Sequence, residues 1–80
     1  MPNPHVDFPA LLRFVAAKHG VTEEAIFSRS KKRIISDARN EVYYLSAESG
    51  LSHYKIGKLI NRSVTTVNAG ICTYKRRIGR

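Results

Sequence analysis

Side chains able to form hydrogen bonds are concentrated in the segment RSVTTVN, residues 62–68. Each threonine hydroxyl can donate and accept a hydrogen bond, and its methyl group offers a small apolar contact. The arginine guanidinium adds a planar fork of N–H donors, and the asparagine amide supplies both donors and an acceptor. Such a mixture can recognise a partner that displays donors, acceptors and methyl groups, as the base edges in a DNA major groove do.

The spacing of residues around this segment predicts a helix-turn-helix. Gly57 is small where the second helix must cross closely, and Asn61 lies at the corner, where a left-handed backbone is usual. Val67 can pack back on the first helix, and Ser63 can cap the second by accepting a backbone N–H. Recognition helices contact bases from their N-terminal end. The side chains that we expect at the major groove are Arg62, Ser63, Val64, Thr65, Thr66 and Asn68.

Basic side chains on both helices of this motif suit the phosphate backbone. Lys55 and Lys58 are three residues apart and share a helix face, and the amide groups near Ser52 suit a phosphate. Lys75 and Arg76 can bind phosphate, or they can simply stabilise the C-terminal end of their own helix. The residues expected at the DNA backbone are Ser52, His53, Lys55, Lys58, Lys75 and Arg76.

The net charge of +8 is unevenly distributed along the chain. Residues 1–27 hold two basic and three acidic side chains, whereas residues 28–80 hold twelve basic and three acidic ones. An ordinary solvated surface or an anionic membrane could also account for such a charge. Because the whole basic excess lies around the expected helix-turn-helix, nucleic acid is the better interpretation.

Metal, redox and catalytic sites need residues that are sparse here. The single cysteine, Cys72, excludes an internal disulfide, and the three histidines are too scattered to suggest a metal site. We expect Cys72 to be buried in the helix-turn-helix core, as free cysteines usually are. No paired acid and base, activated nucleophile or glycine-rich phosphate loop occurs, so neither an enzyme nor a nucleotide or other cofactor is expected. Without a membrane-length apolar run or a signal-peptide pattern, the expected location is the cytoplasm.

The N-terminal third predicts two helices. Residues 1–7 are expected to form a flexible, extended end, and Asp7 can cap a first helix with Pro9 in its first turn. Gly20 should end that helix, and Thr22 should start a short second one whose last residues, Ala25, Ile26 and Phe27, dock on the core. The inner stripe of the first helix consists of Phe8, Leu11, Leu12 and Val15.

Three more helices complete an all-α fold with five helices around one core, which we expect to form a single domain over residues 8–80. A long helix should begin near Lys32 and end at Glu48 or Ser49, a fourth should cover about His53 to Ile60, and a fifth should follow Ser63. The residues expected to be buried in these helices are Ile35, Ala38, Val42, Leu45, Tyr54, Ile56, Leu59, Val67, Ile71, Tyr74 and Ile78.

The order of these elements resembles the C-terminal DNA-binding domain of the bacterial replication initiator DnaA. The matching segments are VAAKHGVTEEAIFSRSKK, IISDARNEVYYLSAESGLS and YKIGKLINRSVTTVNAGI, which together cover about four-fifths of the chain. That family carries a serine-led helix containing IG and a signature of the form GGRDHTTV. The residues that match these motifs are Ser52, Ile56, Gly57, Arg62, Thr65, Thr66 and Val67.

The resemblance implies further roles. Arg39, which on composition alone could pair with Asp37, Glu41 or a neighbour, becomes a candidate reader of the minor groove. The basic run Lys31, Lys32 and Arg33 is assigned to backbone contacts.

Two departures from the family signature affect base recognition. Its aspartate and histidine are replaced by Ser63 and Val64. Serine can still cap the helix, but valine has no polar group with which to read a base, and one good base contact contributes about 1–3 kcal/mol of discrimination. We therefore expect a different target site, or weaker specificity, rather than recognition of the initiator's own site.

The leading hypothesis is a stand-alone, sequence-specific double-stranded DNA-binding protein that regulates transcription or replication, with an origin in a phage or mobile element suggested by its size and architecture. It could bind its own sites or compete with a host initiator. The alternative is an adaptor that keeps the fold, has lost specific DNA recognition and binds a protein, for example in the host replication or transcription machinery. Self-association is a further option for a module with so small a footprint.

Overall fold

The computed structural model describes residues 8–78, which form five α-helices. No strand occurs among these residues, so the predicted all-α class is confirmed. The helices are α1 (Phe8–His19), α2 (Glu23–Phe27), α3 (Arg33–Glu48), α4 (His53–Ile60) and α5 (Val64–Arg77).

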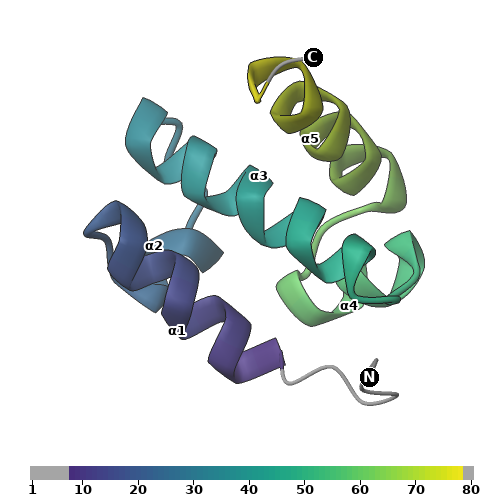
Figure 1. Cartoon of the computed structure of the whole chain (residues 1–80), viewed down its shortest axis with the longest axis horizontal. Coiled ribbons are helices and arrows are strands. Elements are labelled where there is room, and N and C mark those ends of the chain that lie inside the picture. The colour runs from purple at the N-terminus through teal and green to yellow at the C-terminus, as the bar shows by residue number, and fades with distance from the viewer. Residues whose placement is uncertain (1–7, 79–80) are drawn as a thin grey trace.

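The longest helix, α3, lies at the centre of the molecule (Figure 1). It contacts all four other helices: α1 and α2 pack along one side, and α4 and α5 lie on the other. Helices α4 and α5 also contact each other and form the expected helix-turn-helix. The proposed binding helix α5 is therefore held by both α3 and α4.

Side-chain caps start three of the helices at the predicted residues. The hydroxyl oxygens of Thr22, Ser52 and Ser63 each accept a hydrogen bond from the backbone N–H three residues later, at 3.0, 3.1 and 3.2 Å. Gly20, with φ of 69°, ends α1 as expected. The predicted cap Asp7 and the predicted flexible end lie outside the described residues.

The core is built mainly from the apolar stripes that the sequence predicts. Tyr43 and Ile60 are also almost completely buried, which the spacing did not predict. Ile35, Leu45 and Tyr74 were expected inside but are only half-buried. The buried apolar residues are Phe8, Leu12, Val15, Ala16, Ile26, Ala38, Val42, Tyr43, Ile56, Ile60, Val67 and Ile71.

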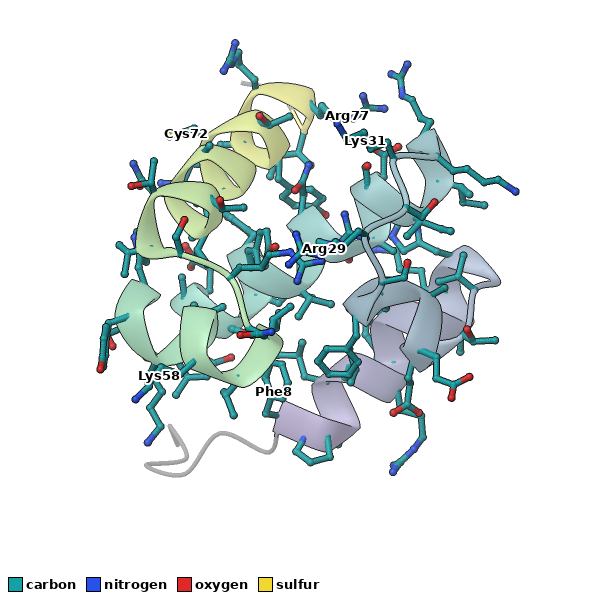
Figure 2. All side chains as sticks on the ribbon, turned by 180° about the vertical axis from the view of Figure 1, so that it is seen from behind. Phe8, Arg29, Lys31, Lys58, Cys72 and Arg77 are labelled. Carbon is teal, nitrogen blue, oxygen red and sulfur yellow. The ribbon has the colours of Figure 1, made fainter. Side chains whose placement is uncertain are left out.

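Five residues expected in the core are exposed instead: Phe27, Tyr54, Leu59, Cys72 and Ile78. Because α4 buries Ile56, Gly57 and Ile60, its inward face excludes Tyr54 and Leu59. Cys72 follows the inward-facing Ile71 and lies about 100° further round α5, on the outer side visible in Figure 2. Phe27 and Ile78 stand at helix ends, beyond the packed turns.

A buried carboxylate ties α1 to α3. Glu41 is 3% exposed, and its two oxygens lie 2.7 Å from Lys18 Nζ and 2.6 Å from His19 Nε2. Burial alone would raise the pKa of this carboxyl group, but the hydrogen bonds and charges of Lys18 and His19 together outweigh burial and hold the pKa below the ordinary value of 4.5. Composition did not predict this pairing.

The lowered pKa of Glu41 predicts a loss of stability in acid. The carboxylate's contribution is fully present above the unfolded-state pKa of 4.5 and is lost as the pH falls through the lower folded-state pKa. Urea unfolding at about pH 6 and about pH 3 should show a smaller acid-induced drop in stability for Glu41→Gln than for the wild type. The exposed control Glu24→Gln should retain the wild-type drop. Equal drops in all three proteins would contradict the role given to Glu41.

Candidate nucleic-acid interface

The turn between α4 and α5 has the geometry that Gly57 and Asn61 predict. Asn61 adopts the left-handed conformation with φ of 64°, and the Arg62 N–H donates to the Gly57 carbonyl oxygen at 2.8 Å. A Cβ atom added at Gly57 would lie 2.5 Å from the carbonyl oxygen of Arg62. Gly57 is therefore required by the close approach of the turn, which fixes the angle at which α5 leaves α4.

The first turn of α5 presents a mixed polar and apolar surface. Ser63 caps the helix, and its hydroxyl also lies 3.0 Å from the hydroxyl of Thr66. Val64, Thr65 and Asn68 are exposed, whereas Val67 is fully buried, as predicted. Apart from Arg62, the residues predicted to reach bases therefore form one accessible surface around the start of the helix.

Arg62 does not extend into solvent. Its Nη1 donates to the carbonyl oxygens of Ile60 and Asn61 at 3.3 and 3.2 Å. Its Nη2 donates to the carbonyl oxygens of Phe27 and Ser28 at 3.3 and 2.7 Å. Arg62 thus connects the α4–α5 turn to the end of α2 and the residue that follows it.

Arg39 is also bound to backbone carbonyls. Its Nε donates to Ile26 O at 2.8 Å, and its Nη2 donates to Ser28 O at 2.6 Å and Ser30 O at 3.3 Å. Burial is the largest cause that lowers the pKa of this guanidinium below its ordinary value, and the charge of Arg62 lowers it further. The ion pair between Arg39 and an acidic neighbour, which the composition allowed, does not form among residues 8–78.

The acidic neighbours of Arg39 pair elsewhere. Asp37 lies 3.9 Å from Arg33 Nε and 3.5 Å from Arg77 Nη2, and Glu41 pairs with α1. Those partners leave the Arg39 charge without a carboxylate among residues 8–78.

A basic hollow of about 330 Å³ lies between the α2–α3 loop and α5. Within the described chain, no carboxylate forms an ion pair with any of its four cationic side chains. Figure 2 shows Arg29 over α3, between this loop and the α4–α5 turn. Arg29 was not predicted as a site residue, although the basic stretch SRSKKR contains it. The residues that line the basic hollow are Arg29, Ser30, Lys31, Arg39, Arg62 and Thr66.

A second hollow, of about 390 Å³, lies on α4. Lys55 and Lys58 both line it, which agrees with their predicted common face, and Ser52 at its edge caps α4. Lys58 Nζ lies 5.3 Å from the centre of the Tyr54 ring, and Leu59 completes the apolar wall. His53 is half-buried at the start of the helix.

The remaining predicted backbone contacts are exposed but dispersed. Lys32 and Arg33 stand at the start of α3. Lys75 and Arg76 lie in the last turn of α5, about 15 Å along the helix axis from Thr66. The structure therefore brings only Lys31, Arg39, Arg62 and Thr66, of the predicted site residues, into the basic hollow.

The described part of the chain holds no cluster of three or more potential metal ligands. None of its helices is both long enough and apolar enough to cross a membrane.

Comparison with known proteins agrees with this geometry. Residues 9–73 match the family described as the bacterial dnaA protein helix-turn-helix. The chain is similar to the chromosomal replication initiator protein DnaA of Oleidesulfovibrio alaskensis, with 32% identity over 76 residues. The matched region is 94% of this chain but only 16% of that relative. No solved structure matches the chain significantly.

Proposed function

Because the chain belongs to the bacterial DnaA helix-turn-helix family, we propose that it binds double-stranded DNA sequence-specifically and regulates transcription or replication. The observation that carries the proposal is the basic hollow beside the exposed first turn of α5. Four cations without carboxylate partners in the described chain favour a polyanionic ligand, and the hydroxyl and amide groups next to them suit base edges.

We assign base recognition to the start of α5. The Thr65 side chain is exposed, and its hydroxyl makes no hydrogen bond within residues 8–78, so this hydroxyl is free to contact a base. Val64 is 43% exposed and can offer only an apolar contact, for example to a thymine methyl group, so the target should differ from the initiator's site. The proposed major-groove residues are Ser63, Val64, Thr65, Thr66 and Asn68, whereas the guanidinium of the also predicted Arg62 binds backbone carbonyls instead.

Phosphate contacts are proposed for the basic residues around this surface. Arg29 joins them because it lines the basic hollow. The minor-groove role of Arg39 remains a prediction. The other proposed backbone contacts are Lys31, Lys32, Arg33, Ser52, His53, Lys55, Lys58, Lys75 and Arg76. A cytoplasmic location and a phage or mobile-element origin belong to the same proposal.

A protein-binding adaptor is the second candidate. The hollow on α4 supports it, since Tyr54 and Leu59 are 63% and 41% exposed beside two lysines. Such a surface suits a partner with both apolar and acidic groups.

Salt dependence separates the two candidates. The affinity for a random duplex, measured by fluorescence anisotropy, should fall steeply as salt rises from about 50 to 200 mM, because each phosphate contact contributes about 0.9 to the logarithmic slope. Absence of binding to any duplex at low salt would reject the DNA proposal and favour the adaptor.

Replacing Thr65 with alanine should reduce preference among sequences. We expect about a tenfold loss on the best site and little change on random duplex, because one base contact is removed while the phosphate contacts remain. Titration of both duplexes measures the ratio, with the exposed Thr73→Ala on the same helix as control. Equal losses on both duplexes would mean that Thr65 does not read bases.

A further inference from the structure

We propose that Arg39 and Arg62 are positioning residues that fix the basic loop, residues 28–32, relative to the start of α5. Their common attachment point is the Ser28 carbonyl, and we call this group of three residues the Ser28 junction. The inference rests on the proposed function, because it assigns to the junction the spacing between two elements that contact DNA.

Two guanidinium groups from different elements converge on one oxygen. Arg39 of α3 and Arg62 of the α4–α5 turn each donate to Ser28 O, at 2.6 and 2.7 Å. A carbonyl oxygen has two lone pairs and can accept both bonds. The loop is therefore attached at the same atom to the central helix and to the turn that leads into α5.

The two arginines of the junction also bind carbonyl oxygens at the end of α2 that have no donor within that helix. The last carbonyls of a helix have no intrahelical donor, and they carry the negative end of its dipole. Arg39 Nε binds Ile26 O at 2.8 Å, and Arg62 Nη2 binds Phe27 O at 3.3 Å. Cations there stabilise α2 and hold its end in place.

The loop has few other attachments within the described chain. The remaining hydrogen bonds of residues 28–32 are local: Ser30 N–H to the Ser28 hydroxyl and Lys32 N–H to the Ser30 hydroxyl, both at 3.2 Å, are examples. The longer-range hydrogen bonds come from Arg39 and Arg62. Removal of either arginine should therefore release the loop without removing a core side chain.

The consequence for DNA binding concerns Arg29 and Lys31. Both are exposed on the loop and line the basic hollow with Thr66 of α5. If the junction sets the distance between these cations and α5, loss of Arg39 weakens binding through the loop. If Arg39 enters the minor groove, its loss weakens binding directly.

A double-mutant cycle distinguishes these two routes. We expect Arg39→Ala to weaken binding to the best duplex about tenfold in the wild-type background. A loss of this size is usual when a hydrogen bond to a charged group is removed. In the Arg29→Ala/Lys31→Ala background, the same change should cost less than about twofold, because effects that act through one element are not additive. A tenfold loss in both backgrounds would overturn the positioning role in favour of direct contact. The control is Arg76→Ala, which removes an exposed cation outside the junction. Its loss of affinity should be the same in both backgrounds.

Two further measurements keep the test independent of folding and of the DNA proposal. Arg39→Lys keeps the charge but replaces the two donating nitrogens, Nε and Nη2, with a single one, so it should lose about as much affinity as Arg39→Ala. A contact that needs only the positive charge would tolerate lysine. Hydrogen exchange of the free protein should show faster exchange at the Ser30 and Lys32 amides in both variants. Unchanged exchange rates at these amides would overturn the role of the junction in holding the loop, whatever the DNA-binding result. If exchange is faster in the variants but the wild-type protein binds no DNA, the junction holds the loop and only its role in DNA binding is overturned.

Discussion

Replacing Gly57 with alanine will lower the free energy of unfolding by about 2 kcal/mol and weaken DNA binding. The new Cβ would lie 2.5 Å from the Arg62 carbonyl oxygen, which is backbone and cannot rotate away. Overpacking of this kind costs up to about 3 kcal/mol, and the better helix propensity of alanine recovers about 1. Relief of the clash requires the α4–α5 turn to open, which changes the angle of α5 against the rest of the interface.

Thermal unfolding followed by circular dichroism measures this effect. A loss of about 2 kcal/mol corresponds to a Tm decrease of roughly 8–16 °C in a domain of this size. Lys58→Ala, on the exposed face beside Gly57, should leave Tm almost unchanged. If the Tm of Gly57→Ala equals that of the wild type, the turn does not depend on the close approach of Gly57 to the Arg62 carbonyl oxygen.

Gly70→Ala is expected to disrupt the contact between α3 and α5 to a similar extent. An added Cβ would overlap the ring of Tyr43, which is 1% exposed, and would lie 2.7 Å from Asn40 Oδ1. Asn40 can rotate, but the buried tyrosine ring cannot move without displacing core neighbours. We expect a net loss of about 1–2 kcal/mol after the gain in helix propensity.

Ala69→Gly is the matched control for Gly70→Ala. Ala69 is exposed, so this reverse substitution reports helix propensity alone and should cost about 1 kcal/mol. Urea unfolding of both variants then separates propensity from the clash. A Gly70→Ala protein that gains as much stability as Ala69→Gly loses would show that α3 and α5 can accommodate the methyl group.

Local signals made most of the fold predictable. The caps at Thr22, Ser52 and Ser63 and the left-handed Asn61 depend on residues close in sequence, and each is confirmed. Helical spacing also identified most of the core. It failed at Leu59 because Ile60 occupies the inward position of the short helix α4, a choice that depends on the neighbouring helices.

The arrangement of the site was less predictable, because its main contacts are to backbone carbonyls. Arg39 and Arg62 were singled out as DNA readers, but nothing in the sequence shows that both bind the carbonyl of Ser28. Glu41 was considered only as a possible partner of Arg39, whereas in the structure it is buried and pairs with Lys18 and His19 of another helix. The positions of these side chains depend on tertiary contacts, which leave no local pattern in the sequence.

Selection of bound sequences from a random duplex pool at moderate salt tests the central claim most directly. We predict an enriched motif that differs from the initiator's site and whose enrichment is lost in Thr65→Ala. Recovery of the initiator's own site would favour competition with a host initiator. A pool without any enrichment, bound only at low salt, would contradict sequence-specific recognition and leave charge-driven binding or a protein partner.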